Sequence, residues 1–229
     1  MDKPKTIGEA ALLLGIDTCG PAGSVALARL IGEGIEVLGE AELEGRTYSA
    51  TLVAAICELL AAHRVALRDV DCLVVTSGPG SFTGVRVGLS ATKGLAEGAD
   101  RRVVAVSRLQ ALAHKAGLRD AALDAHRHEV FLRVAGRELL AGADELVATE
   151  PVPSRIAVCD DAAAALLANG WPGAELVRVA APKAADAITL AVPRVRAGDF
   201  ADVLLLDGHY LRRSDAEIFG DKSSAATQP

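Results

Sequence analysis

Glycine and hydroxyl residues between Thr76 and Gly88 form the stretch of the sequence with the clearest chemical potential. An apolar run, residues 72–75, leads into this stretch, and a helical pattern follows it, which predicts a strand, a tight loop and a helix start. Free backbone amides at a helix start bind anions and phosphates. The residues predicted to make vestigial nucleotide or phosphate contacts are Asp17, Thr18, Gly78, Gly80, Ser81 and Thr83.

The glycine loop matches neither common phosphate fingerprint. Gly78 and Gly84 are too far apart for G-x-x-x-x-G-K-[ST], no lysine follows, and G-x-G-x-x-G fails at its third glycine. A turn that needs glycine only for close packing of a strand on a helix explains the loop at least as well as a ligand site. Asp17 and Thr18, at the tip of an expected hairpin, have an Asx-type turn as the favoured alternative to a phosphate or metal contact.

Other catalytic constellations are weak in this sequence. His126 and His128 would share one face of a strand near Glu129, but solvated turn histidines explain them better, so we assign no metal site. Ser77 and Ser81 have no histidine and aspartate tied to them in sequence, which disfavours a serine protease. We therefore assign no catalytic residue.

Composition limits the classes of partner. The chain has 229 residues, of which 51% are hydrophobic, and this is enough for two compact lobes with a buried core. A net charge of −6 and 3% aromatic residues argue against a protein that binds nucleic acid alone, because that affinity comes from cationic side chains and stacking. We expect contact with RNA only through a complex.

The four cysteines and the apolar runs indicate a cytoplasmic protein. Cys19, Cys57, Cys72 and Cys159 form no C-x-x-C pair and are read as reduced thiols. No run approaches the roughly 20 apolar residues that a membrane span needs, so we expect no membrane partner.

The periodicity predicts two lobes and a tail. Strands are expected over residues 12–17, 24–28, 34–44, 72–75 and 103–106, with helices over 49–64 and 84–98. A second group follows, with strands over 120–124, 129–134, 155–159 and 176–179 and helices over 107–115, 161–168 and 184–196. We therefore predict an N-terminal lobe over residues 1–106, a C-terminal lobe over 107–213, and a disordered polar tail over 214–229.

The two helices beside the glycine loop carry apolar or small residues on more than one face. A helix sandwiched inside one domain and a helix that forms a subunit interface explain this pattern about equally well. Interior glycines in the second helix would let another backbone approach closely, from the same chain or from a partner. The predicted partner interface comprises Leu52, Val53, Ile56, Cys57, Leu60, Gly84, Val85, Gly88, Ala91, Thr92 and Leu95.

Several blocks of the sequence together resemble a known family. They are GIDT at residues 15–18, SVAL at 24–27, GPGSFTGVRVGL at 78–89, KGLA at 93–96, ALDA at 122–125, EVF at 129–131 and YLR at 210–212. The chain resembles the TsaB (YeaZ) family of bacterial tRNA-modification proteins. The resemblance implies an α/β fold of the actin-like ATPase class (ASKHA, ribonuclease H-like), in which each of two related lobes has a mixed β-sheet flanked by helices.

The resemblance also implies a function in a complex. Family members serve as non-catalytic scaffold and activator subunits in making N6-threonylcarbamoyladenosine (t6A) in tRNA, with the larger paralogue TsaD as the transferase and TsaE as an ATPase. Helices next to the glycine loop form the homodimer when the protein is alone, or the heterodimer with TsaD. The chain would have no cofactor of its own, and ATP or ADP could bind at the partner interface.

Three positions depart from the family pattern: Thr47–Tyr48, His128, and the segment 207–209. The rival function is a self-sufficient actin-fold ATPase or small-molecule kinase. That activity would need a second glycine-bearing phosphate turn, and the corresponding segment, residues 124–128, has no glycine. The active cleft is therefore expected to be degenerate.

Overall fold

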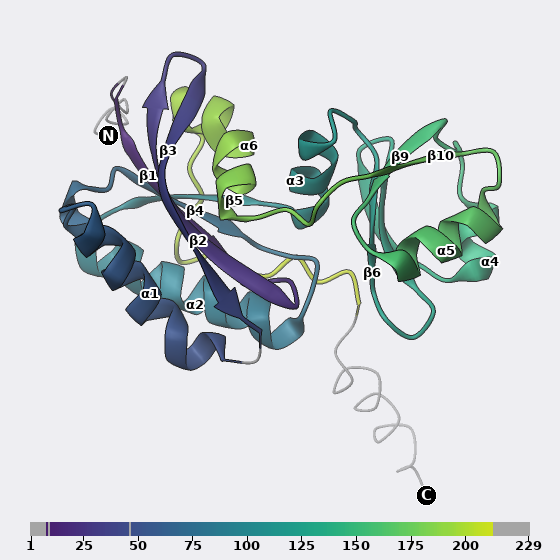
Figure 1. Cartoon of the computed structure of the whole chain (residues 1–229), viewed down its shortest axis with the longest axis horizontal. Coiled ribbons are helices and arrows are strands. Elements are labelled where there is room, and N and C mark those ends of the chain that lie inside the picture. The colour runs from purple at the N-terminus through teal and green to yellow at the C-terminus, as the bar shows by residue number, and fades with distance from the viewer. Residues whose placement is uncertain (1–7, 9, 46, 213–229) are drawn as a thin grey trace, which may run out of the picture.

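A computed structural model describes residues 8, 10–45 and 47–212, and the tail predicted over residues 214–229 lies outside these ranges. Figure 1 shows two β-sheets side by side, each flanked by helices. The two lobes have the same strand order, as detailed below, which confirms the predicted actin-like fold of two related lobes. No helix in the described ranges is long and apolar enough to cross a membrane.

The first sheet has five strands in the order β3-β2-β1-β4-β5. β1 pairs antiparallel with β2 and parallel with β4, and β5 continues the parallel side. The strands are β1 (Leu12–Asp17), β2 (Ala22–Ile31), β3 (Gly34–Glu44), β4 (Cys72–Thr76) and β5 (Arg102–Val106).

The second sheet repeats this topology in the order β10-β9-β6-β7-β8. β6 pairs antiparallel with β7 and parallel with β9, as β1 does with β2 and β4 in the first sheet. The strands are β6 (Ala121–Asp124), β7 (Val130–Val134), β8 (Arg137–Ala141), β9 (Arg155–Val158) and β10 (Glu175–Arg178). The sequence pattern missed β8, which pairs with β7 through a tight turn at Ala135 and Gly136.

Helices cover both faces of the first sheet (Figure 1). α1 (Tyr48–Ala62) and α2 (Phe82–Ala99) lie on one face, and α6 (Ala184–Ala197) lies on the other. α3 (Arg108–Lys115) contacts both α6 and the second sheet, so it joins the lobes. The second sheet carries α4 (Ala143–Ala148), which the sequence pattern missed, and α5 (Asp161–Gly170), and a short 3₁₀ turn spans Leu67–Asp69.

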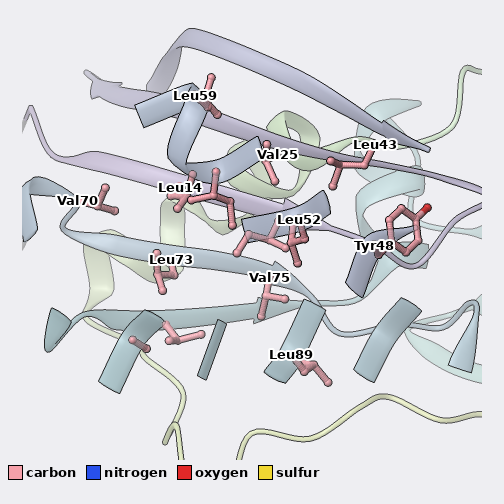
Figure 2. Packing of buried hydrophobic residues seen from close by; sticks show 14 of the residues in the cluster. Leu14, Val25, Leu43, Tyr48, Leu52, Leu59, Val70, Leu73, Val75 and Leu89 are labelled. Atoms are coloured by element: carbon pink, nitrogen blue, oxygen red, sulfur yellow. The ribbon is translucent and has the colours of Figure 1, made fainter. Parts of the chain in front are cut away.

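Because its sheet is covered on both faces, β1 is apolar almost throughout. Leu14 and Ile16 point into the core under α1 and α2, where they meet Leu52 and Leu73 (Figure 2). Leu13 points the other way, into the cluster under α6. Successive side chains of β1 therefore alternate between two separate cores, one on each face of the sheet.

α6 follows the second sheet in sequence but packs on the first sheet. Its buried residues recur at helical spacing from Ala184 to Val195. Gly15 lies so close to Ile188 and to the Ala184 carbonyl that a Cβ at position 15 would stand 2.8–2.9 Å from them. The boundary predicted between residues 106 and 107 separates the two sheets, whereas α6 returns to the lobe before it.

Candidate functional site

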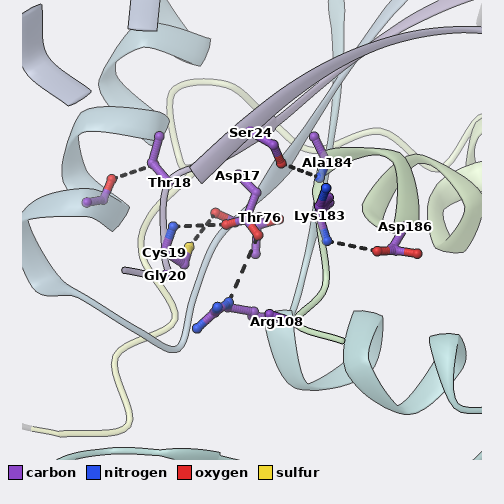
Figure 3. A network of polar contacts seen from close by, with 12 residues as sticks. Asp17, Thr18, Cys19, Gly20, Ser24, Thr76, Arg108, Lys183, Ala184 and Asp186 are labelled. Atoms are coloured by element: carbon purple, nitrogen blue, oxygen red, sulfur yellow. Dashed lines mark hydrogen bonds and ion pairs between the residues drawn. The ribbon is translucent and has the colours of Figure 1, made fainter. Parts of the chain in front are cut away.

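The hairpin between β1 and β2 forms the base of the site (Figure 3). Asp17 is 2% exposed, and its Oδ1 accepts a hydrogen bond from the Cys19 amide at 2.9 Å, which is an Asx-type turn. Its Oδ2 lies 4.0 Å from Nε of Arg108. Burial raises the pKa of Asp17, and the nearby Arg108 charge only partly opposes this.

The glycine loop is fitted tightly onto this hairpin. A Cβ at Gly80 would collide with the Cys19 carbonyl oxygen, one at Gly84 with the Thr18 carbonyl oxygen, and one at Gly88 with Thr18 Oγ1. Thr18 Oγ1 also donates to the Gly84 carbonyl at 2.7 Å. These three glycines therefore allow the start of α2 to approach the hairpin backbone of the same chain.

Gly78 has a separate conformational requirement. Its φ is +115°, and a Cβ there would stand 2.9 Å from the carbonyl oxygen of His209. The Gly78 carbonyl accepts a hydrogen bond from the Arg108 amide at 2.7 Å. The loop thus connects the hairpin, the start of α3 and the C-terminal segment.

Of the residues predicted to contact phosphate, only some reach the surface. Asp17, Thr18 and Gly78 are buried, whereas Ser81 and Thr83 are exposed at the first turn of α2. Ser81 is the N-cap of that helix, since its Oγ accepts from the Gly84 amide at 3.3 Å. The structure therefore brings these residues into one loop assembly, but it uses most of them for packing.

A cleft of about 1230 Å³ lies between the lobes, with the glycine loop on one wall. The opposite wall includes the turn after β6, and residues 209–212 also line the space. The charged residues of this lining are Arg86, Arg108, Arg127, Arg212, Asp124 and Asp160. From the sequence alone, Arg108 is read with Arg101, Arg102 and Lys115 as part of a solvated edge. This reading is wrong for Arg108, which is only 7% exposed.

The turn after β6 adopts a left-handed backbone without glycine. His126, Arg127 and His128 have φ values of 60°, 56° and 60°. Such values cost roughly 1–2 kcal/mol for each non-glycine residue. Asp124 supports the turn by accepting from the His126 amide at 2.8 Å and by pairing with His126 Nδ1 at 2.8 Å. The turn therefore keeps the left-handed conformation although it contains no glycine. Its side chains occupy positions that a glycine-bearing phosphate turn would leave free for a phosphate group.

Metal binding at this turn gains no support. Within the described ranges, no three His, Cys, Asp or Glu side chains are grouped so that they could hold a metal ion. His126 is highly exposed, and its partner is the Asp124 carboxylate that caps the turn.

The C-terminal segment joins the lobes through His209. Its amide donates to the Ser77 carbonyl at 2.7 Å, and its Nε2 lies 2.8 Å from Oε2 of Glu138 on β8. Ser107 and Arg133 also donate to Glu138. Burial opposes ionisation of Glu138, but the hydrogen bonds from His209 and Ser107 outweigh it and hold its pKa below the usual value. Sequence reasoning noted residues 207–209 only as a departure from the family pattern.

Tyr48, another departure, has a structural role. Its ring is buried, its hydroxyl donates to the Gly20 carbonyl at 2.8 Å, and the absent Cβ of Gly23 makes room for the ring. Burial raises the pKa of Tyr48 to about 12.

The predicted interface residues divide into buried and accessible sets. The larger set is buried in the core of this chain because α1 and α2 both pack on the first sheet. It comprises Leu52, Ile56, Leu60, Gly84, Val85, Gly88 and Thr92. Val53 is 52% exposed, Cys57 is exposed, and Ala91 and Leu95 are half-buried. Leu204 and Leu205 add exposed apolar surface beside α2, where Lys93 Nζ donates to the Leu204 carbonyl.

A family model described as TsaD, tRNA N6-adenosine threonylcarbamoyltransferase, matches residues 41–210. The crystal structure of an uncharacterised Pseudomonas aeruginosa protein with similarity to peptidase YeaZ superposes on 88% of this chain and 100% of its own, with a TM-score of 0.74 and 28% identity. TsaB from Haemophilus influenzae is 42% identical over 55% of this chain. The chain belongs to this TsaD-like family, in its TsaB (YeaZ) branch.

The predicted family membership is thus confirmed. The match spans about half the length of the curated TsaB relatives, 54% of the Haemophilus protein and 52% of the Escherichia coli one. A Novosphingobium aromaticivorans tRNA N6-adenosine threonylcarbamoyltransferase is 29% identical over 95% of this TsaB-family chain and 69% of its own length.

Proposed function

We propose that this chain takes part in the biosynthesis of t6A in tRNA as a non-catalytic subunit that binds a TsaD-like transferase. The observation that carries the proposal is the family match over residues 41–210. It is supported by the names of the TsaB relatives, which are tRNA threonylcarbamoyladenosine biosynthesis proteins. A TsaE-like ATPase completes the proposed complex, and tRNA contacts this chain only within it.

The accessible apolar face of α1 and α2 is the proposed partner surface. Val53 and Cys57 lie one turn apart on α1 and are both exposed. Leu95 on α2 adds apolar area, and so does the exposed Leu205, which follows the Leu204 carbonyl that accepts a hydrogen bond from Lys93 of α2. Burial of exposed apolar side chains provides the main driving force for protein association. We propose that the same surface forms a homodimer when the chain is alone, and that any ATP or ADP binds at the junction with the partner.

The direct test of the function is reconstitution. Threonylcarbamoyl transfer to tRNA is measured with the TsaD-like and TsaE-like proteins of the same organism, with and without this chain. We expect product only when the chain is present. Transfer at an undiminished rate without the chain would refute the proposed role.

The interface is tested separately by charge insertion. Val53→Arg and Cys57→Arg together should weaken co-purification with the TsaD-like protein at least tenfold, since two cations would be desolvated in an apolar contact. Val147→Arg is the matched control because Val147 is 72% exposed on α4 of the other lobe. Equal binding of both variants would show that the partner docks elsewhere.

The rival function is tested with the isolated chain. Turnover of ATP or phosphorylation of a small molecule without any partner, lost in the Asp17→Ala variant, would favour a self-sufficient actin-fold ATPase or kinase over the subunit role.

A further inference from the structure

Residues 206–212, here called the strap, run from the core of the first lobe to the core of the second. Leu206 is buried in the cluster under α1 and α2, and Leu211 packs against the cluster that contains Leu123 of β6. Figure 1 shows the strap in yellow-green, crossing from the first lobe to the second. Residues 209–212 also line the cleft between the lobes, so the strap lies along that cleft.

The first lobe holds the strap at the glycine loop and at the start of α2. The His209 amide donates a hydrogen bond to the Ser77 carbonyl at 2.7 Å. A Cβ at Gly78 would stand 2.9 Å from the His209 carbonyl oxygen, so the strap packs directly on the loop. The ring centroid of Tyr210 lies 5.1 Å from that of Phe82, the first residue of α2. Residues 209 and 210 are therefore attached to the first lobe.

The second lobe holds the strap through side chains. His209 Nε2 lies 2.8 Å from Oε2 of Glu138 on β8, and Arg212 pairs with Glu129, immediately before β7. The attachments to the two lobes thus lie within residues 209–212. Three residue steps of extended chain span at most about 11 Å. The strap is therefore a short tether between the lobes.

Glu138 joins the strap to two further elements. Its side chain is 7% exposed. Besides its contact with His209, it accepts a hydrogen bond from Ser107, the N-cap of α3, at 2.7 Å and one from Arg133 of β7 at 3.0 Å. Each donor to a buried carboxylate matters, because the low local dielectric strengthens every bond and penalises an unpaired charge. The strap, α3 and the second sheet therefore meet at one charged group.

We propose that the strap limits how far the two lobes separate, with its side-chain contacts to Glu138 and Glu129 as the releasable attachments. Hinge motion between lobes is the usual behaviour when a cleft divides them. Opening this cleft beyond the length of the tether breaks the contacts at one end of the strap. The side chains of His209 and Arg212 are partly exposed, whereas Leu206 is buried in the first lobe, so the attachment to the second lobe is the end that yields. This device belongs to the isolated chain and is independent of the proposed subunit role.

Double electron–electron resonance measures the separation of the lobes directly. One spin label is attached at Glu33→Cys in the turn between β2 and β3, and the other at Val147→Cys on α4, because both positions are exposed. Cys57 and Cys159, the cysteines that are not buried, are replaced by serine. The labelled chain is diluted with unlabelled chain so that only distances within one molecule contribute. We expect a single narrow distance when the strap is intact, and a broad or two-peaked distribution there would overturn the proposal.

His209→Ala combined with Arg212→Ala removes both attachments. This double variant should shift the distribution to longer distances and at least double its width. Arg155→Ala is the matched control because it breaks an ion pair with Glu175, at 3.1 Å, that lies wholly within the second sheet, and it should leave the distribution unchanged. An unchanged distribution in the double variant, or the same shift in Arg155→Ala, would overturn the proposal. If thermal melting shows that the double variant does not fold, His209→Ala alone should give a smaller shift in the same direction, and no shift in it would overturn the proposal.

Discussion

Because Gly84 has no side chain, the start of α2 can pack directly against the Thr18 carbonyl in the hairpin between β1 and β2. The carbonyl of Thr18 occupies the space that a Cβ at Gly84 would need, and backbone atoms there have little freedom to move away. Gly94, on the same helix, is exposed and has no neighbour within 4 Å of a Cβ position. Gly84 and Gly94 therefore form a matched pair for substitution by alanine, one at a close contact and one in open space.

Gly84→Ala should lower the free energy of unfolding by about 1–3 kcal/mol, because the added methyl group forces the helix away from the hairpin. Gly94→Ala should raise it by about 0.4–1 kcal/mol, because alanine restricts the unfolded chain without a clash. Urea denaturation of the isolated chain measures both values. A neutral Gly84→Ala would contradict the close approach.

Glu138 gives a pH-dependent contribution with a defined sign. Its pKa is lower in the folded chain than in the unfolded chain, so the stabilisation is fully present above the unfolded value of about 4.3 and is lost as pH falls through the folded value. Wild type should exceed Glu138→Gln in unfolding free energy at neutral pH, and this difference should shrink in acid. Denaturant titrations at several pH values measure it, and a difference that stays constant between pH 7 and pH 3 would contradict the assignment.

Local residue chemistry was predictable from sequence, and long-range pairing was not. The Asx-type turn at Asp17 and the cap at Ser81 depend on neighbours within three residues. Arg108 meets Asp17, and His209 meets Glu138 across 71 positions of sequence, only because two sheets and α3 bring them together. No periodicity in the sequence indicates which distant charges will meet.

The N-cap of α2 makes a contribution to stability that a single substitution can measure. Ser81 Oγ satisfies one of the amides that a helix start leaves unpaired. Ser81→Ala should therefore destabilise the chain by about 0.5–2 kcal/mol in thermal or urea unfolding. Thr83→Ala, two residues later on an exposed position, should have no cost because alanine has the higher helix propensity. Equal effects of the two changes would show that the cap does not stabilise the helix.

The elements missed from sequence share a physical cause. β8 has no apolar alternation of its own, since Arg137 and Glu138 open it, and it forms because a turn at Ala135 and Gly136 with positive φ returns the chain along β7. α4 has only six residues, of which Leu146 is buried, so its periodic signal is short. In contrast, α1 and α2 are long enough for their sequences to predict helices. The sequence did not indicate which of their faces is covered.

The two sheets have separate hydrophobic clusters, so the two lobes can be perturbed separately. Ile188→Ala removes a fully buried side chain between α6 and β1 and should cost about 2–5 kcal/mol. Hydrogen exchange should then accelerate throughout the first sheet and α6 while β9 and α5 keep their protection. Leu167→Ala, in the core of the second sheet, is the control and should give the reverse pattern. Equal loss of protection in both sheets after Ile188→Ala would indicate a single cooperative unit.

The two-lobed architecture could be predicted because strand and helix periods alternate twice along the chain, and the family resemblance implied a mixed sheet flanked by helices in each lobe. The strand order within each sheet was not predicted. The assignment of α6 to the first sheet could not, because an amphipathic helix indicates that one face is buried but not against which sheet.

The return of α6 has a consequence for synthesis on the ribosome. Residues 107–180 emerge between the five strands of the first sheet and the helix that covers its second face. Until residue 197 has left the exit tunnel, the face that receives Ala184, Ile188 and Val192 is open, with Leu13 and Val74 exposed to solvent. The nascent first lobe therefore carries an uncovered apolar sheet for the time needed to translate the second lobe, and this interval is when a chaperone would be needed most.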